Sequence, residues 1–201
     1  MADDVPAPPP RSADVRACIA RAHALGVPRD YARARRLTRV REPRRLEFIG
    51  YDTQQRAQWL APRAARAWTR LREAAGKNGV ELQIVSAFRS VEYQLGILER
   101  KLARGQVISE ILRVSAAPGY SEHHCGRALD ITTPGFATLA EEFENSPAFT
   151  WLEKNARRFG FRLSYPRRNP HGIAYEPWHW CWHAKQSSPA SRARSPAIPT
   201  P

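Results

Sequence analysis

Two stretches decide the fold of this chain: SEHHCGRALD at residues 121–130 and EPWHW at residues 176–180. Together they offer imidazoles and a carboxylate that suit one metal ion, and a further carboxylate, Glu176, three residues before His179. A catalytic zinc typically takes three protein ligands and keeps a fourth position for water. A carboxylate beside that water can accept its proton during attack on a carbonyl. The two stretches therefore supply the parts of a metal-assisted hydrolase.

A third segment, Ser86-Ala87-Phe88-Arg89-Ser90 followed by Gln94, accompanies the two metal motifs. In this order, Ser-x-Phe-Arg-Ser…Gln, Ser-x-His-x-x-Gly-x-Ala-x-Asp and Glu-Pro-Trp-His resemble the zinc D-alanyl-D-alanine carboxypeptidases of the VanY type. That group also includes D-Ala-D-Ala dipeptidases, L-alanyl-D-glutamate endolysins and the Hedgehog signalling domain. The resemblance extends from about Phe48 to His183.

The resemblance implies a role for each matching residue. It implies His123, Asp130 and His179 as ligands of a Zn²⁺ ion. It implies Glu176 as the general base and then the general acid, and Arg89 as the group that stabilises the oxyanion or holds a substrate carbonyl or carboxylate. The implied substrate-binding residues are Ser121, Gln94 and Trp178.

The residues themselves leave one choice of ligand to be made. His123 and His124 are adjacent, and the register of the first motif selects His123. We interpret His124 as a hydrogen-bond donor behind the ligand or as a surface residue. Asp130 lies between Leu129 and Ile131, where an unpaired carboxylate is costly to bury and where metal ligation would remove that cost.

The chain departs from the family pattern beside both metal motifs. Where the family usually has arginine, two residues after the histidine of Glu-Pro-Trp-His, this chain has Cys181, and where a small residue such as threonine is usual it has Cys125. We expect these cysteines to lie near each other as buried thiols, with a disulfide as the alternative. His183 alternates with Cys181 and His179, but alternate residues of a strand lie ~7 Å apart, so we interpret His183 as outside the metal site.

Length and composition predict a single domain with tails. The chain has 201 residues, an apolar fraction of 42% and six tryptophans, which suffice for a core. It has no run of apolar residues long enough to span a membrane. Residues 1–12 and 185–201 are predicted to be disordered tails, and residues 1–11 lack the features of a secretory signal. The compartment is left open, since the resemblance implies the periplasm or cell wall and the cytoplasm is the alternative. We expect a monomer.

Residues 13–45 are predicted to form a basic helical extension. Ser12 is expected to cap a first helix, and a second is expected over residues 30–40. The formal charge of the chain is +13, and seven arginines fall between Arg33 and Arg45. This cluster is consistent with contact to an anionic polymer, and equally with an arginine-rich solvated face.

Residues 46–184 are predicted to form the zinc peptidase domain. We expect an α+β fold with a small, mainly antiparallel sheet and packed helices, like the Hedgehog and D,D-peptidase zinc domains. Alternation at residues 80–85 predicts a strand that delivers Arg89, and residues 128–132 predict another that carries Asp130. Residues 173–182 predict a last strand, in which Pro177 forces an irregularity that lets Glu176 and His179 reach one metal ion.

These expectations favour a zinc-dependent peptidase that hydrolyses peptidoglycan stem peptides. A D,D-carboxypeptidase that releases terminal D-Ala is the first choice. The alternatives are an endolysin-like L-alanyl-D-glutamate endopeptidase, and a non-catalytic, zinc-stabilised module that binds cell wall or polyanions. Glu176 distinguishes the enzymes from the binding module, which has no need of a base.

Overall fold

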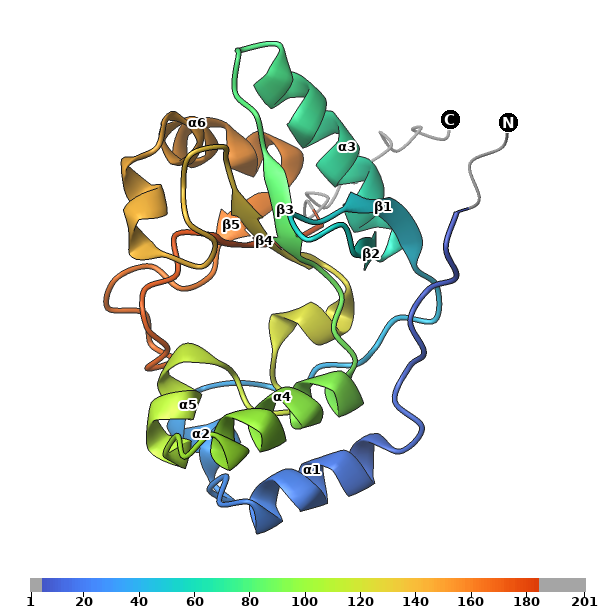
Figure 1. The fold of residues 1–201 in the computed structure, drawn as a ribbon, viewed down its shortest axis with the longest axis vertical. Coiled ribbons are helices and arrows are strands. Elements are labelled where there is room, and N and C mark those ends of the chain that lie inside the picture. Colours follow the sequence, from blue (N-terminus) through green and yellow to red (C-terminus); the bar gives the residue numbers. More distant parts are fainter. Residues whose placement is uncertain (1–4, 185–201) are drawn as a thin grey trace, which may run out of the picture.

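The computed structural model describes residues 5–184, in which helices and two small antiparallel sheets form an α+β fold. Figure 1 shows α1, α2, α4 and α5 together at one end of the molecule, and the strands with α3 and α6 at the other. The tail predicted at residues 185–201 lies outside the described residues, as do residues 1–4 of the tail predicted at residues 1–12. Among the described residues, no helix is long and apolar enough to cross a membrane.

The central sheet has four strands in the order β3-β4-β6-β5, and every neighbouring pair is antiparallel. Its strands are β3 (Gln83–Ser86), β4 (Ala128–Thr132), β5 (Phe161–Leu163) and β6 (His179–Trp182). Leu129 and Ile131 of β4 join the main core on one face, against α3 (Pro62–Gly76) and α6 (Pro147–Asn155). Because side chains alternate along a strand, Asp130 is left for the opposite face. The predicted strand over residues 128–132 is confirmed.

The smaller sheet is a hairpin of β1 (Glu47–Tyr51) and β2 (Ala57–Leu60), and the sequence patterns did not predict β2. The buried carboxylate of Asp52 closes the hairpin, since it accepts hydrogen bonds from the backbone N–H groups of Gln54 and Arg56 at 2.8 and 3.0 Å. Gln58 then accepts a hydrogen bond from Ala87 N at 2.9 Å. The hairpin thereby supports the segment that follows β3 and carries Arg89.

The helical layer consists of α1 (Val15–Ala24), α2 (Tyr31–Ala34), α4 (Val91–Ala103) and α5 (Ile108–Val114), which share a second core cluster. Asp14 caps α1, whereas the Ser12 hydroxyl donates to Glu42 at 2.6 Å and accepts from Glu92 N at 2.8 Å. Residues 13–45, which were predicted as a basic helical extension, thus pack against α4 and α5. The boundary at residue 46, between the N-terminal extension and the zinc peptidase domain, stays a prediction.

Three predicted elements are shorter in the structure. The strand expected over residues 80–85 is β3, which spans only Gln83–Ser86. The helix expected over residues 30–40 ends at Ala34, because Arg36 takes a positive φ of 51° that a right-handed helix cannot continue. The strand expected over residues 173–182 begins only at His179, because a turn interrupts it. Three short 3₁₀ segments complete the fold: η1 (Glu122–Cys125), η2 (Glu141–Asn145) and η3 (Ala156–Phe159).

Candidate metal centre

The register of two strands places Asp130 beside His179. Asp130 of β4 is directly opposite His179 of β6 in the antiparallel pair, so their side chains share one face of the sheet. The Oδ1 atom of Asp130 lies 3.0 Å from Nδ1 of His179. Both residues are buried. The juxtaposition follows from strand pairing alone.

The η1 turn brings His123 to the same point. Ser121 precedes the turn and accepts a hydrogen bond from His123 N at 3.3 Å, and Gly126 ends it with a φ of 63°. Nδ1 of His123 lies 2.5 Å from Ala87 O; a carbonyl can only accept, so this nitrogen carries the proton. Nε2 is therefore left with its lone pair, and it lies 3.2 Å from Oδ2 of Asp130.

Glu176 reaches the cluster through a turn rather than along a strand. His179 N donates to Glu176 O at 3.1 Å, which closes a turn with Pro177 at its second position, where the fixed φ of proline suits it. The carboxylate of Glu176 ends 3.7 Å from Nδ1 of His179. As predicted, the chain bends at Pro177 so that the side chains of Glu176 and His179 lie close together. The bend is a turn before the strand and not an irregularity within it.

The three residues His123, Asp130 and His179 offer one ligand atom each, and these atoms lie within 4.8 Å of one another. Nε2 of His123 is buried and has no hydrogen-bond partner among the described residues. Each oxygen of Asp130 faces a different imidazole. The buried Nε2 of His123 thus has a lone pair without a hydrogen-bond partner, and the Asp130 carboxylate lies between two imidazoles. These donor atoms suit a divalent ion such as zinc.

Electrostatic interactions within the cluster are strong. Burial alone raises the pKa of Asp130, but the two facing imidazoles hold it well below its usual range. Burial lowers the pKa of His123 to about 4, and the charge of Arg89 adds to this. For His179, burial lowers the pKa, but the hydrogen bonds to Asp130 and Glu122 outweigh it and raise the pKa to about 10.

Two glutamates next to the cluster differ in their acidity. Burial raises the pKa of Glu176 to about 7. Burial also raises the pKa of Glu122, but its hydrogen bond to His179 outweighs this and lowers the pKa to about 2. Oε2 of Glu122 lies 3.0 Å from Nε2 of His179, so a carboxylate fixes the far side of that ring. The sequence analysis missed this contact, which joins residues 57 positions apart.

Arg89 enters the site from the segment after β3. Its guanidinium donates to Oδ2 of Asp130 at 3.4 Å and to Oε1 of Gln94 at 3.3 Å, and its buried Nε has no partner among the described residues. Gln94 is itself fixed by donating to Ser115 Oγ and Ala116 O. His124 is buried and holds the backbone, since its Nδ1 donates to Arg89 O at 2.7 Å and its Nε2 accepts from Gly119 N at 3.1 Å. His124 is therefore not a surface residue, and it supports the backbone of Arg89 rather than a proposed metal ligand.

A cavity of about 520 Å³ opens beside the cluster, between the helical layer and the sheet. All eight predicted site residues line it: Arg89, Gln94, Ser121, His123, Asp130, Glu176, Trp178 and His179. Lys101 and Tyr165 also line it, and no motif singled them out. Tyr165 packs on the ring of His179, with ring centroids 4.8 Å apart. Burial lowers the pKa of Lys101, and the positive charge of Arg89 adds to this.

The two cysteines beside the metal motifs are both free thiols. A hydrogen bond from Cys181, together with Arg127, lowers the pKa of Cys125, and the same hydrogen bond and burial raise the pKa of Cys181. The expectation that they lie close together is confirmed, but only Cys181 is buried, whereas Cys125 is partly exposed. His183, which follows β6, lies near Cys181.

The fold is that of a zinc-peptidase group, and comparison with known proteins identifies the family. The family described as VanY, D-alanyl-D-alanine carboxypeptidase, matches residues 57–185, and the chain belongs to it. The candidate carboxypeptidase YodJ of Bacillus subtilis is 32% identical over 149 residues, which cover 71% of this chain and 53% of YodJ. The chain spans about half the length of the curated relatives it matches.

Two solved structures confirm the α+β fold. The LdcB LD-carboxypeptidase superposes with a TM-score of 0.65 and 31% identity, over 72% of this chain and 71% of LdcB. A mutant of the vancomycin-resistance D,D-pentapeptidase VanY in complex with Zn(II) superposes with a TM-score of 0.56 and 26% identity, over 74% of this chain and 87% of VanY. The VanY-type resemblance seen in the sequence is therefore confirmed.

Proposed function

We propose that this protein is a zinc-dependent D,D-carboxypeptidase that releases terminal D-Ala from peptidoglycan stem peptides. One observation carries the proposal: the carboxyl of Glu176, with its pKa raised to about 7, lies at the candidate metal cluster inside a cavity that also holds Arg89. A base poised near neutrality and a cationic group in one cavity are what amide hydrolysis requires. Membership of the VanY family supports the same reaction.

The metal would be zinc, held by His123, Asp130 and His179. Two nitrogen ligands and one carboxylate oxygen are a set typical of catalytic zinc, and the orphaned Nε2 of His123 fits it. When bound there, zinc supplies Lewis-acid polarisation of the scissile carbonyl and makes the attacking water more acidic. The Zn(II) complex of the related VanY supports this choice of ion.

The other residues of the cavity have separate tasks. Glu176 takes the proton of the attacking water and passes it to the leaving amine. Arg89 presents its guanidinium to the oxyanion that forms or to a substrate carboxylate, and Gln94 orients Arg89 through their 3.3 Å hydrogen bond. Ser121 and Trp178 line the cavity, where we assign them contacts to the substrate backbone and side chain.

The charges of the cavity suit a carboxypeptidase. Arg89 and Lys101 both line it, and two cations suit a substrate that ends in a free carboxylate close to the scissile bond. An endopeptidase acting between L-Ala and D-Glu would also place a carboxylate, that of D-Glu, near the scissile bond, so the preference for the carboxypeptidase rests on membership of the VanY family. The 31% identity to the LD-carboxypeptidase LdcB raises a second candidate, release of D-Ala from a tetrapeptide stem.

Mass spectrometry of digested stem peptides separates these reactions. The protein is incubated with muramyl pentapeptide and, separately, with muramyl tetrapeptide, with and without a chelator. We expect the pentapeptide to lose one alanine, the reaction to stop with chelator and to resume with zinc. Loss of alanine from the tetrapeptide alone would support the L,D activity, and cleavage after L-Ala would support the endopeptidase. Absence of any cleavage with zinc bound would support the non-catalytic module.

We further propose that the arginines between Arg33 and Arg45 contact an anionic polymer such as the cell wall, and that the protein is monomeric. Within this cluster Arg35 is occupied, because it donates to the backbone carbonyls of His171 and Gly172. The other six arginines are exposed. Binding to purified cell wall should therefore weaken steeply with salt and survive chelation.

A further inference from the structure

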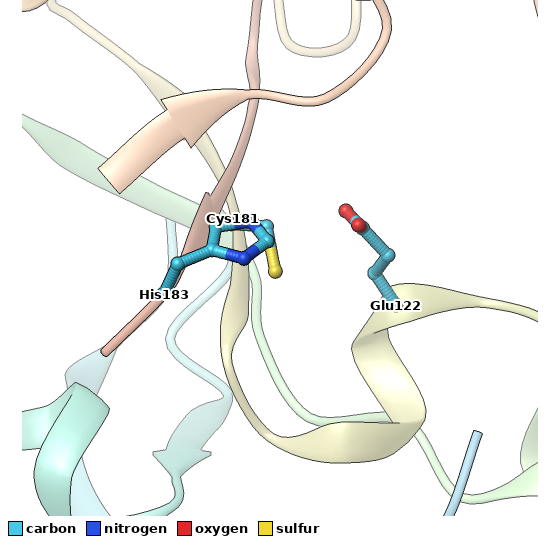
Figure 2. A group of neighbouring side chains, drawn as sticks. All are labelled: Glu122, Cys181 and His183. Atoms are coloured by element: carbon cyan, nitrogen blue, oxygen red, sulfur yellow. The ribbon is translucent and has the colours of Figure 1, made fainter. Parts of the chain in front are cut away.

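A second group of metal-binding side chains lies beside the first. Glu122, Cys181 and His183 each offer one ligand atom, and these three atoms lie within 4.8 Å of one another. Figure 2 shows the three side chains converging from two places, with Glu122 on the η1 turn and Cys181 and His183 at the end of the last strand. We propose that this group is a second metal site, which takes Zn²⁺ or a similar borderline ion.

The fold explains why the group assembles. Cys181 is opposite Ala128 in the β4–β6 pair, two residues along β6 from His179, so Cys181 and His179 share a face of the sheet. His183 follows the strand, where its backbone N–H donates to Gly160 O at 2.8 Å. His179 and His183 are too far apart along one strand to bind one ion, but His183 can share an ion with Cys181 because Glu122 approaches both from η1.

The chemistry of the three ligands selects the ion. A thiolate, an imidazole and a carboxylate match the sulfur, nitrogen and oxygen ligands that Zn²⁺ accepts, whereas Mg²⁺ and Ca²⁺ prefer oxygen alone. Cys181 is buried and the other two are partly buried. A zinc ion with three protein ligands commonly keeps a fourth position for water. In the free protein the thiol of Cys181 donates to Cys125, so an ion binding here would displace the proton of Cys181. The resulting thiolate and the carboxylate of Glu122 would together balance the charge of a divalent ion.

Glu122 connects the two sites. One of its oxygens, Oε2, is 3.0 Å from Nε2 of His179, the nitrogen that faces away from Asp130. A carboxylate has two oxygens, so Glu122 can serve His179 with one and the second ion with the other. Cys125 has no ligand role in this proposal, because its sulfur already contacts Glu122 O at 2.8 Å and Arg127 Nε at 3.2 Å.

The test uses Co²⁺ in place of zinc on the reduced protein. The first cluster has no sulfur ligand, so a thiolate-to-cobalt charge-transfer band in the near ultraviolet reports the second site alone. We expect such a band, saturating at one ion, and metal analysis should find a second bound ion per chain. Because neither readout is activity, the result does not depend on the proposed peptidase reaction.

Matched variants assign the band. Cys181→Ser should abolish it and remove one bound ion, and His183→Ala should raise the Kd for that ion by more than about 10-fold, since even partners behind a ligand are worth that much. Cys18→Ser, Cys125→Ser and Asp130→Asn should all keep the band, and Asp130→Asn should lose the ion of the first cluster instead. A wild-type protein without the band, or a band that survives Cys181→Ser, would overturn the second site. Circular dichroism checks that each variant is folded.

Discussion

Replacing Glu176 with glutamine tests the proposed base without changing the shape of its side chain. No described residue donates a hydrogen bond to the Glu176 carboxyl, and its closest charged neighbour is Nδ1 of His179 at 3.7 Å. The amide therefore loses no hydrogen bond of the folded protein, and only proton transfer is removed. A positioned base typically contributes about 10²–10⁴-fold, so we expect kcat to fall by that factor, or about 3–5 kcal/mol.

The same substitution should stabilise the metal-free protein. Burial raises the pKa of Glu176 from 4.5 to about 7, so the folded state holds its proton more tightly than the unfolded state does. The Glu176 carboxyl therefore does not lower the free energy of unfolding below pH 4.5, where it is protonated in both states. As the pH rises through 7 the free energy of unfolding falls, by about 3 kcal/mol for a pKa shift from 4.5 to about 7. Glutamine carries no charge and escapes this loss, so the Tm of the metal-free variant at pH 8 should exceed that of the wild type.

Three measurements on Glu176→Gln decide the outcome: turnover of muramyl pentapeptide, zinc content, and the Tm after chelation. Glu47→Gln is the matched control. Glu47 lies on β1, is partly exposed, and pairs with Arg66 of α3. We expect zinc content to match the wild type while turnover falls. Near-normal turnover would refute the role of Glu176. Loss of zinc together with turnover would show instead that Glu176 holds the ion.

Three further predictions concern the surroundings of the ion. Arg89→Lys keeps the charge but loses the fork that contacts both Asp130 and Gln94, so steady-state kinetics should show kcat lower by about 10²-fold with zinc content unchanged. Glu122→Gln removes the carboxylate behind His179, and competition with a chromophoric chelator should show zinc affinity at the first cluster lower by about 10–100-fold. The pKa of His179 is raised to about 10 in the metal-free protein, so zinc must displace its proton at pH 8. Calorimetry in buffers of different ionisation enthalpy should then show about one proton released per ion, and affinity that rises with pH.

The helices and one strand of the site could be predicted because their signals are local. Residues 91–103 form a helix that Ser90 caps, since the Ser90 hydroxyl accepts from Tyr93 N, and such a cap lies next to the helix in the sequence. The alternation of Leu129, Asp130 and Ile131 was enough to place the carboxylate opposite the core. Motif spacing, together with the resemblance, selected residues that the fold then brings around one cavity.

What the sequence did not predict depends on distant contacts. β2 was missed because its residues alternate poorly and its hairpin is closed by the polar side chain of Asp52. The last strand was drawn too long because residues 173–178 are apolar enough for a strand, whereas tertiary contacts place a turn there. Glu122 was overlooked for the same reason, since only the folded chain shows that it reaches His179 and the Cys181 thiol.

The balance of charge explains why a metal ion fits a chain that already has a net charge of +13. Three carboxylates, Asp130, Glu122 and Glu176, are clustered around His179, and burying them without compensation would be costly. In the metal-free protein His179 compensates by keeping its proton, which is why its pKa rises to about 10. A divalent ion held by His179 would replace that proton with a larger charge, while Nε2 of His179 would keep its hydrogen bond to Glu122. The positive charge that the fold requires at this point is thus supplied by the proton or by the ion, and the competition between them makes metal binding depend on pH.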